Sequence, residues 1–139
     1  MGRAAGARLR VLLDTHALIW ALEGSARLPR TARRVIEDPR NEVLVSAASA
    51  MEIAIKKSLG RLRAPDDLES ACDEAGFVRR AVGFDEARVL ESLPWHHRDP
   101  FDRLLVCHAI SERATLVTRD RELSAYGVAT LWGSARQGD

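Results

Sequence analysis

Short aliphatic runs alternate with amphipathic helical stretches along the 139-residue chain, and this alternation constrains the fold more than any other feature. Runs such as RVLLD, EVLV and TLVT are short, apolar and rich in Val or Leu, which is typical of strands. Strands that alternate with helices predict a mostly parallel sheet, and right-handed crossovers place helices on both of its faces. We therefore expect an α/β fold, a three-layer sandwich around a mostly parallel central sheet.

Turn and capping residues predict where the strands and helices begin and end. Strands are predicted at 10–14, 42–45, 77–82, 115–118 and 128–132. Helices are predicted at 15–22, 30–38, from Ser46 or Ser49 to a left-handed cap at Gly60, and at 66–75, 85–93, 100–113 and 121–126. Thr15 is expected to cap the first helix. The chain then divides into one domain over 10–133, with tails at 1–9 and 134–139.

Four acidic residues fall near strand ends or helix starts. Asp14 and Asp120 each follow an apolar strand, while Glu52 and Asp102 are expected in the first turns of helices. The carboxyl ends of parallel strands form one rim, so we expect these carboxylates to share a crevice. Two carboxylates about 5 Å apart repel by roughly 3 kcal/mol at an effective dielectric of about 20. The cluster therefore predicts a bound cation.

Oxygen ligands favour hard divalent cations, so the expected cofactor is Mg²⁺ or Mn²⁺ rather than zinc. Such ions support phosphoryl chemistry, because they neutralise the phosphodiester, orient a water and stabilise the leaving oxyanion. No Ser, Cys or Lys nucleophile with a matching base is evident in the sequence, which argues against a covalent intermediate. The predicted reaction is hydrolysis of a nucleic-acid backbone by a metal-activated water.

Four segments carry a family resemblance: VLLDTHALIWAL, VSAASAMEIAIKKSLGRL, HRDPFDRLLVCHA and LVTRD. In order and spacing, from about Arg10 to Trp132, the chain resembles the PIN-domain ribonucleases of the VapC toxin type. The resemblance implies metal-dependent endoribonuclease activity and inhibition by a cognate VapB-type antitoxin. It also implies a homodimer built on the helices near Trp20 and Ile36. Transfer RNA is a frequent target in the family, although no residue here identifies it as the substrate.

The same resemblance assigns roles by position. It implies that Asp14 and Asp120 hold the main metal ion, while Asp102 and Glu52 position that ion, a second ion or the attacking water. Asp99 is a close neighbour whose role stays open. Supporting positions are Thr15 and Thr118, the latter a small hydroxyl residue two positions before Asp120.

Each acidic residue also has a purely structural interpretation. Glu52 stands three residues after Ser49, which fits a capping box. Asp99 before Pro100 is a typical helix cap, and Asp102 in the first turn gains about 0.3–1 kcal/mol from the helix dipole. A capping role for Asp14 is disfavoured because Thr15 already offers a cap. The sequence therefore favours function for Asp14, Glu52, Asp102 and Asp120, and structure for Asp99.

Basic and aromatic residues near the acidic motifs are candidate RNA contacts. Arg98, Arg103 and Arg119, with the neighbouring Arg121, are expected either to bind phosphates or to form solvated salt bridges. The adjacent His96 and His97 are expected in a solvated loop. Trp20 lies on an apolar helical face, where a core or interface position is expected rather than base stacking.

The composition of the chain limits which binding modes and cellular locations we expect. The 21 basic and 20 acidic side chains leave a net charge of +1, so any nucleic-acid binding must use a local patch. Two isolated cysteines predict neither a zinc site nor a disulfide, and the expected location is the cytoplasm. The basic start MGRAAGARLR is followed by Asp14 and His16, which argues against a signal peptide. No uncharged run approaches the roughly eighteen residues that a membrane span needs.

Two alternative functions stay open. An aspartyl phosphotransferase or phosphatase would use Asp14 as its nucleophile, but the companion aspartate two residues later is absent because position 16 is His. A non-catalytic PIN-like binding module would keep the fold without cleaving RNA. A dinucleotide-binding role is disfavoured, since the sequence contains neither GxGxxG nor a P-loop.

Overall fold

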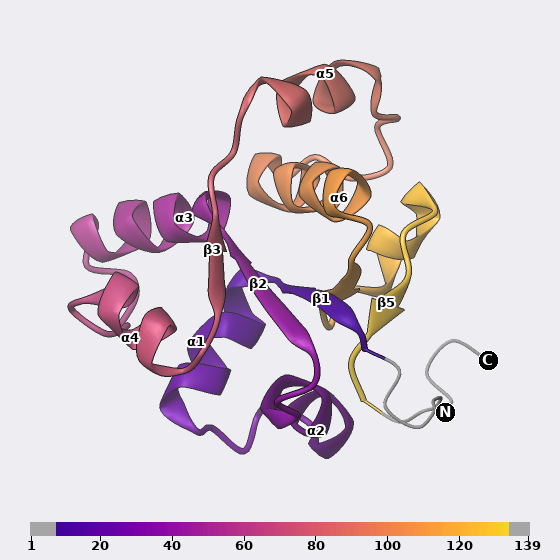
Figure 1. Cartoon of the computed structure of the whole chain (residues 1–139). Helices are drawn as coiled ribbons and strands as arrows, with labels where there is room; N and C mark the ends of the chain where they lie inside the picture. The colour runs from indigo at the N-terminus through magenta and orange to yellow at the C-terminus, as the bar shows by residue number, and fades with distance from the viewer. Residues whose placement is uncertain (1–7, 134–139) are drawn as a thin grey trace, which may run out of the picture.

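The computed structural model describes residues 8–133, which form a five-stranded sheet with helices on both faces (Figure 1). All neighbouring strands are parallel, and their order is β3-β2-β1-β4-β5. The strands are β1 (Arg10–Leu13), β2 (Glu42–Ser46), β3 (Val78–Arg80), β4 (Thr115–Val117) and β5 (Thr130–Leu131). The predicted parallel sheet is confirmed.

The helices make the two outer layers of the predicted α/β sandwich. They are α1 (Thr15–Glu23), α2 (Arg30–Glu37), α3 (Ala47–Ser58), α4 (Leu68–Glu74), α5 (Phe84–Ser92) and α6 (Pro100–Glu112), followed by the 3₁₀ helix η1 (Arg121–Tyr126). In Figure 1, α5 and α6 lie above the sheet and α1 and α2 lie below it, with α3 and α4 toward the β3 edge. The three-layer arrangement is confirmed.

The sheet separates two apolar cores, because successive side chains of a strand point to opposite faces. In β1, Val11 and Leu13 pack with α1 and α2 residues, whereas Leu12 packs with α6 residues such as Leu105. All three β1 side chains are fully buried, which explains the continuous apolar run that identified this strand. Trp20 belongs to the first core, as its apolar helical position predicted.

The strand order places a crevice between β1 and β4. The chain steps from β1 to β2 and β3 on one side, then returns through α5 and α6 to β4 on the other side of β1. Leu13 pairs with Val117, and the next amide, that of Asp14, donates to the Val117 carbonyl at 3.0 Å. Loops that leave the carboxyl ends of these two strands diverge to opposite faces, which opens a binding crevice there.

Several predicted boundaries need correction. Strand β1 ends at Leu13, and Asp14 rather than Thr15 is the N-cap of α1. Ser46 caps α3, so the alternative start at Ser49 is wrong. The edge strands β3 and β5 are shorter than predicted, because each pairs with only part of one neighbour. Residues 121–126 form a 3₁₀ rather than an α-helix.

The ends of the chain fall partly outside the described residues. The predicted tails at 1–7 and 134–139 lie there, whereas Leu9 is hydrogen-bonded: its amide donates to Asn41 Oδ1 at 3.0 Å and its carbonyl accepts from the Glu42 amide at 2.8 Å. Across residues 8–133, no helix is both long enough and apolar enough to cross a membrane.

Candidate metal centre at the carboxyl ends of the central strands

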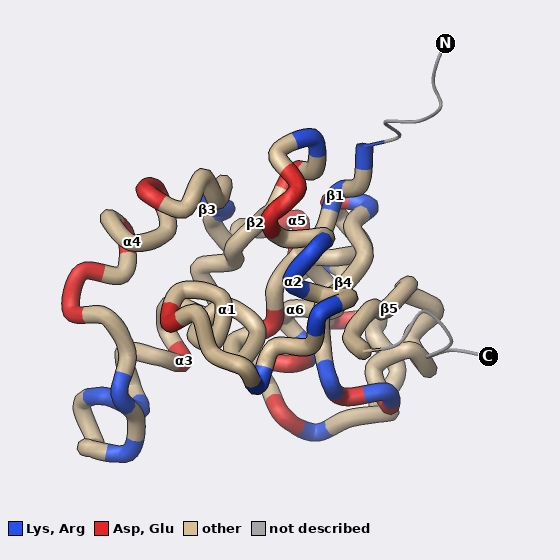
Figure 2. Tube along the Cα trace, turned by 90° about the horizontal axis from the view of Figure 1, so that it is seen from below, with Lys and Arg blue, Asp and Glu red and all other residues tan. Residues whose placement is uncertain are grey.

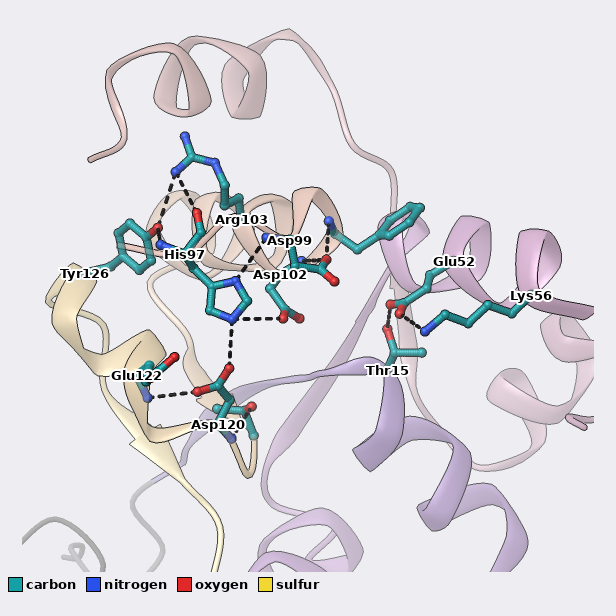
Figure 3. Close-up of polar contacts among 12 residues, drawn as sticks. Thr15, Glu52, Lys56, His97, Asp99, Asp102, Arg103, Asp120, Glu122 and Tyr126 are labelled. Carbon is teal, nitrogen blue, oxygen red and sulfur yellow. Dashed lines mark hydrogen bonds and ion pairs between the residues drawn. The ribbon is translucent and has the colours of Figure 1, made fainter. Parts of the chain in front are cut away.

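A cavity of about 400 Å³ lies at the crevice between β1 and β4. Figure 3 shows how side chains from separate elements converge there. The predicted acidic cluster lines this cavity together with Asp99 and two cations: Asp14, Thr15, His16, Glu52, Lys56, Asp99, Asp102, Arg119 and Asp120. The four acidic segments of the sequence thus meet at one site.

Asp14 stands at the junction of β1 and α1 and is only 8% exposed. Its Oδ1 accepts the Ala17 amide at 2.8 Å, so the capping role that the sequence disfavoured does exist. Burial raises the pKa of Asp14, while hydrogen bonds from the Ala17 amide and the Thr118 hydroxyl oppose that rise. The backbone fixes the carboxylate at the cavity wall, and the charge it carries there is costly without a partner.

Glu52 lies in the second turn of α3, not in the first turn as predicted, and it is 6% exposed. The Thr15 hydroxyl donates to Oε1 at 2.6 Å, and Lys56 Nζ donates to Oε2 at 2.7 Å. Because Ser46 caps the helix, the capping-box interpretation of Glu52 with Ser49 is wrong. Lys56 supplies a counter-charge inside the acidic cluster that the sequence analysis did not identify.

Asp99 and Asp102 are presented by the first turn of α6. Asp99 is the N-cap, and its Oδ1 accepts the amides of Phe101 at 2.9 Å and Asp102 at 3.1 Å, as the structural interpretation expected. Burial raises the pKa of Asp102 to about 6; the charge of Asp99 acts in the same direction, and His97 opposes it. The fold therefore destabilises the ionised Asp102 side chain relative to the unfolded chain, while the carboxylate still predominates at neutral pH.

This pKa predicts that Asp102→Asn stabilises the metal-free protein at neutral pH. The folded-state pKa exceeds the ordinary value of 3.8, so the carboxylate destabilises the fold increasingly as pH rises through this range and most of all above pH 6. Removing the charge should raise the free energy of unfolding by about 1–2 kcal/mol at pH 7.5, a Tm rise of roughly 3–8 °C. Thermal unfolding in EDTA, followed by circular dichroism, measures this gain.

A comparison at pH 4 provides the control for the Asp102 prediction. There the native carboxyl is mostly protonated, so wild type and Asp102→Asn should unfold at nearly equal temperatures. A variant that is less stable than wild type at pH 7.5 in EDTA would contradict the charge argument.

Asp120 follows β4 and caps η1 by accepting the Glu122 amide on Oδ1 at 2.9 Å. Its other oxygen, Oδ2, lies 3.0 Å from His97 Nε2, and Asp102 Oδ2 lies 3.6 Å from the same nitrogen. His97 is thus part of the site rather than of a solvated loop, which corrects the sequence expectation. His96 packs edge-on against Tyr126, with ring centroids 4.9 Å apart.

The backbone selects the tautomer of His97. The Asp99 amide donates to Nδ1 at 3.1 Å, so Nδ1 must present its lone pair and the ring proton must sit on Nε2. That Nε2 proton points at Asp120, and the ring has no free lone pair for a metal ion. His97 therefore orients the Asp120 carboxylate by hydrogen bonding, a common role for groups around metal ligands.

The donor set fits a hard divalent ion. A ring nitrogen of His97 and carboxylate oxygens of Asp102 and Asp120 lie within 4.8 Å of one another, and Asp14, Glu52 and Asp99 face the same cavity. Because His97 donates its ring proton, the remaining candidate ligands are carboxylates. Carboxylate oxygen is the ligand type that Mg²⁺ and Mn²⁺ prefer. The identity of the ion stays a prediction.

The predicted arginine contacts separate into three groups. Arg103 is 3% exposed and donates to backbone carbonyls of the loop before α6, so it is built into the structure rather than available to a phosphate. Arg119 is exposed and lines the acidic cavity. Arg98 and Arg121 are exposed and do not line that cavity.

Comparisons with known proteins agree with this architecture. The profile of the PIN domain family matches residues 11–129. The chain is similar in structure to VapBC2 from Rickettsia felis bound to a DNA fragment of its promoter, with a TM-score of 0.65 and 16% identity over 89% of this chain and 99% of that one. It is also similar to DNA-bound VapBC from Salmonella typhimurium, with a TM-score of 0.63 and 18% identity over 88% of this chain and 97% of that one.

A third similar structure belongs to VapBC-5 from Mycobacterium tuberculosis, with a TM-score of 0.55 and 18% identity over 88% of this chain and 98% of that one. At these identities the structural likeness shows the fold. No curated protein matches the sequence significantly.

Proposed function

This chain belongs to the PIN domain family, and we propose that it is a metal-dependent endoribonuclease toxin of the VapC type. The observation that carries the proposal is the convergence of Asp14, Glu52, Asp102 and Asp120 on one cavity at the strand switch point. Asp14 and Asp120 also cap helices, but capping does not require four carboxylates to share one cavity, where their mutual repulsion costs stability.

The proposed roles follow from the contacts. Asp14, Asp102 and Asp120 would hold the ion, while Glu52 would position it or the attacking water. When bound, Mg²⁺ or Mn²⁺ would lower the pKa of a water, neutralise the scissile phosphate and stabilise the leaving oxyanion. His97 keeps Asp120 oriented toward the cavity. Cleavage by water leaves a 3′-hydroxyl and a 5′-phosphate, and needs no attack by the ribose 2′-hydroxyl.

Lys56 is proposed to switch partners during substrate binding. In the structure it pairs with Glu52 at 2.7 Å and lines the acidic cavity. Its side chain is 43% exposed, so it can contact a phosphate oxygen without desolvating a buried group. Thr15 holds the other Glu52 oxygen, which keeps that carboxylate in place when Lys56 moves.

The proposed regulators are a VapB-type antitoxin and a second copy of the chain. Three similar structures carry VapBC in their description, and two of them are bound to DNA. The expected homodimer near Trp20 and Ile36 must use other positions on α1 and α2, because these two side chains are 7% and 8% exposed and pack in the core.

The aspartyl phosphotransferase alternative is less well supported by the geometry. A nucleophilic carboxylate needs an accessible oxygen, whereas Asp14 is 8% exposed and holds the Ala17 amide with Oδ1. A binding module without catalysis would have no use for the accumulated negative charge. Both alternatives are tested by the same metal experiment.

We expect RNA cleavage to require a divalent ion. Purified protein incubated with single-stranded RNA should cleave it in Mg²⁺ or Mn²⁺, stop completely in EDTA and recover when Mn²⁺ is added in excess. Mapping of the RNA ends should give 5′-phosphates that a phosphate-dependent ligation reaction detects. Cleavage that persists in chelator, or 2′,3′-cyclic phosphate ends, would contradict the proposed mechanism.

A further inference from the structure

A second groove, with a volume of about 540 Å³, adjoins the acidic cavity. The two hollows share His16 and Arg119 in their walls, so they lie next to each other. We infer that this groove binds the sugar-phosphate backbone of the RNA on one side of the scissile bond, through Arg27, Arg63 and Arg119. The inference rests on the proposed ribonuclease function and assigns a substrate-binding site to it.

The walls of the groove come from distant parts of the chain. Arg27 follows α1, Arg63 lies between α3 and α4, and Arg119 follows β4. Figure 2 shows Lys and Arg in blue on the loop that projects between α3 and α4, on the side where α1 and α3 lie. The three guanidiniums thus meet because of the fold and not because of sequence proximity.

The charge of the groove is opposite to that of the acidic cavity. Three arginines face one acidic residue, Glu23, in the groove, whereas five carboxylates face Lys56 and Arg119 in the cavity. A nucleic-acid strand needs this division, because only the scissile phosphate sits at the metal, while the next phosphates need cations of the protein.

The three arginine side chains are not engaged by carboxylates or by hydrogen-bond acceptors of the described residues. Within residues 8–133, none of their side chains forms an ion pair with a carboxylate or donates a hydrogen bond to the protein. Arg10, Arg79 and Arg103, by contrast, are each engaged with protein acceptors. Free guanidiniums beside a catalytic cavity are suited to bidentate phosphate contacts.

The aromatic residues of the groove favour backbone binding over base stacking. Trp20 and Trp132 are only 7% and 9% exposed, with ring centroids 5.9 Å apart. Arg119 and Arg27 lie over the Trp20 ring, 5.4 and 5.9 Å from its centroid. The rings therefore support the guanidiniums by cation–π contact and leave little face for a nucleobase. Recognition in this groove should be independent of sequence.

The test uses Arg27→Gln/Arg63→Gln, which leaves Arg119 in place. Binding of a fluorescein-labelled, mixed-sequence single-stranded RNA, roughly a 20-mer, is measured by anisotropy in Ca²⁺, and cleavage of the same RNA is measured in Mn²⁺. We expect Kd and KM to rise about 10- to 100-fold at low salt with kcat nearly unchanged, because the removed contacts bind substrate and transition state alike. The slope of log Kd against log salt should fall by about 1.4, or about 0.7 for each lost contact.

Arg88→Gln/Arg113→Gln is the matched control. It removes the same charge from two exposed arginines, one on α5 and one directly after α6, that line neither hollow, and it should leave Kd and the salt slope unchanged. Arg27→Lys/Arg63→Lys should retain the salt slope of wild type, since it keeps both charges. Equal losses in this control and in the groove variant would overturn the inference in favour of a general charge effect.

The outcomes separate this inference from the proposed function. If wild type cleaves RNA in Mn²⁺ and the groove variant has the Kd, KM and salt slope of wild type, the groove inference fails while the ribonuclease stands. The free arginines would then suit an acidic peptide instead. If wild type binds RNA through the groove but cleaves none in Mn²⁺, the ribonuclease proposal fails while the binding site stands.

Discussion

Asp14→Asn and Asp120→Asn are each expected to lower the rate of RNA cleavage by roughly 10²- to 10⁴-fold. Both carboxylates face the cavity in which the proposed ion is held. Replacing one with a neutral amide removes a negative charge from the ligand set, which weakens the ion where the phosphate must be neutralised. Single-turnover cleavage in saturating Mn²⁺ separates a loss in the chemical step from a loss of metal affinity.

The same substitutions should leave the fold intact. Asparagine caps helices as well as aspartate does, so the amide oxygen introduced by Asp14→Asn can still accept the Ala17 amide, and that of Asp120→Asn the Glu122 amide. Burial already raises the pKa of Asp14, so removal of its charge relieves a cost of folding in the metal-free protein. We expect the Tm of Asp14→Asn in EDTA to equal or exceed that of wild type. The Tm of Asp120→Asn should be slightly lower than that of wild type, because its amide nitrogen replaces the oxygen that accepts the His97 Nε2 proton.

Asp67→Asn is the matched control for these variants. Asp67 caps α4 by accepting the Ser70 amide at 3.1 Å, and it does not line the acidic cavity. The substitution makes the same chemical change at a helix start and should leave cleavage within about 2-fold of wild type. Full cleavage by Asp14→Asn would show that the carboxylate serves only as a cap, and the proposed metal centre would then be wrong.

The fold could be predicted because its main signals are local. The apolar runs of β1, β2 and β4 are buried on both faces, and Gly60 and Gly76 have the positive φ values that end the preceding helices. A parallel sheet then places strand ends on one rim, so Asp14 and Asp120 could be brought together without coordinates. The lengths of the edge strands β3 and β5 were predicted less well, because each length depends on how much of the neighbouring strand it pairs with.

The remaining site residues depend on contacts that sequence spacing does not encode. Lys56 lies one turn after Glu52 on α3, and this i,i+4 spacing was the available signal for their ion pair. The role of His97 depends on a backbone amide that selects its tautomer, and adjacent histidines gave no sign of that contact. Position relative to Asp99 within HRDPFDR was the one indication that His97 belongs to the site.

Arg103 shows most clearly why sequence neighbourhood misled the prediction. It was expected to contact RNA because it adjoins Asp102, yet the next position on a helix points about 100° away. Its guanidinium instead enters the loop before α6 and donates to the carbonyls of Pro94 at 2.8 Å and Leu93 at 3.3 Å. It also lies 3.7 Å from the ring centroid of Trp95 and 3.3 Å from the Tyr126 hydroxyl. That hydroxyl accepts the His97 amide at 2.8 Å, so Arg103 supports the loop that holds His97.

Arg103→Ala is therefore expected to lower the free energy of unfolding by about 2–4 kcal/mol, because it removes the donor to the Leu93 and Pro94 carbonyls and the packing against Trp95. Arg103→Lys should recover only part of this loss, since one ammonium cannot replace the guanidinium fork. Urea denaturation followed by circular dichroism gives the values. Arg98→Ala, at an exposed arginine of the same loop, should change stability by less than about 0.5 kcal/mol. A phosphate-binding Arg103 would give the opposite pattern: unchanged stability with a raised KM for RNA.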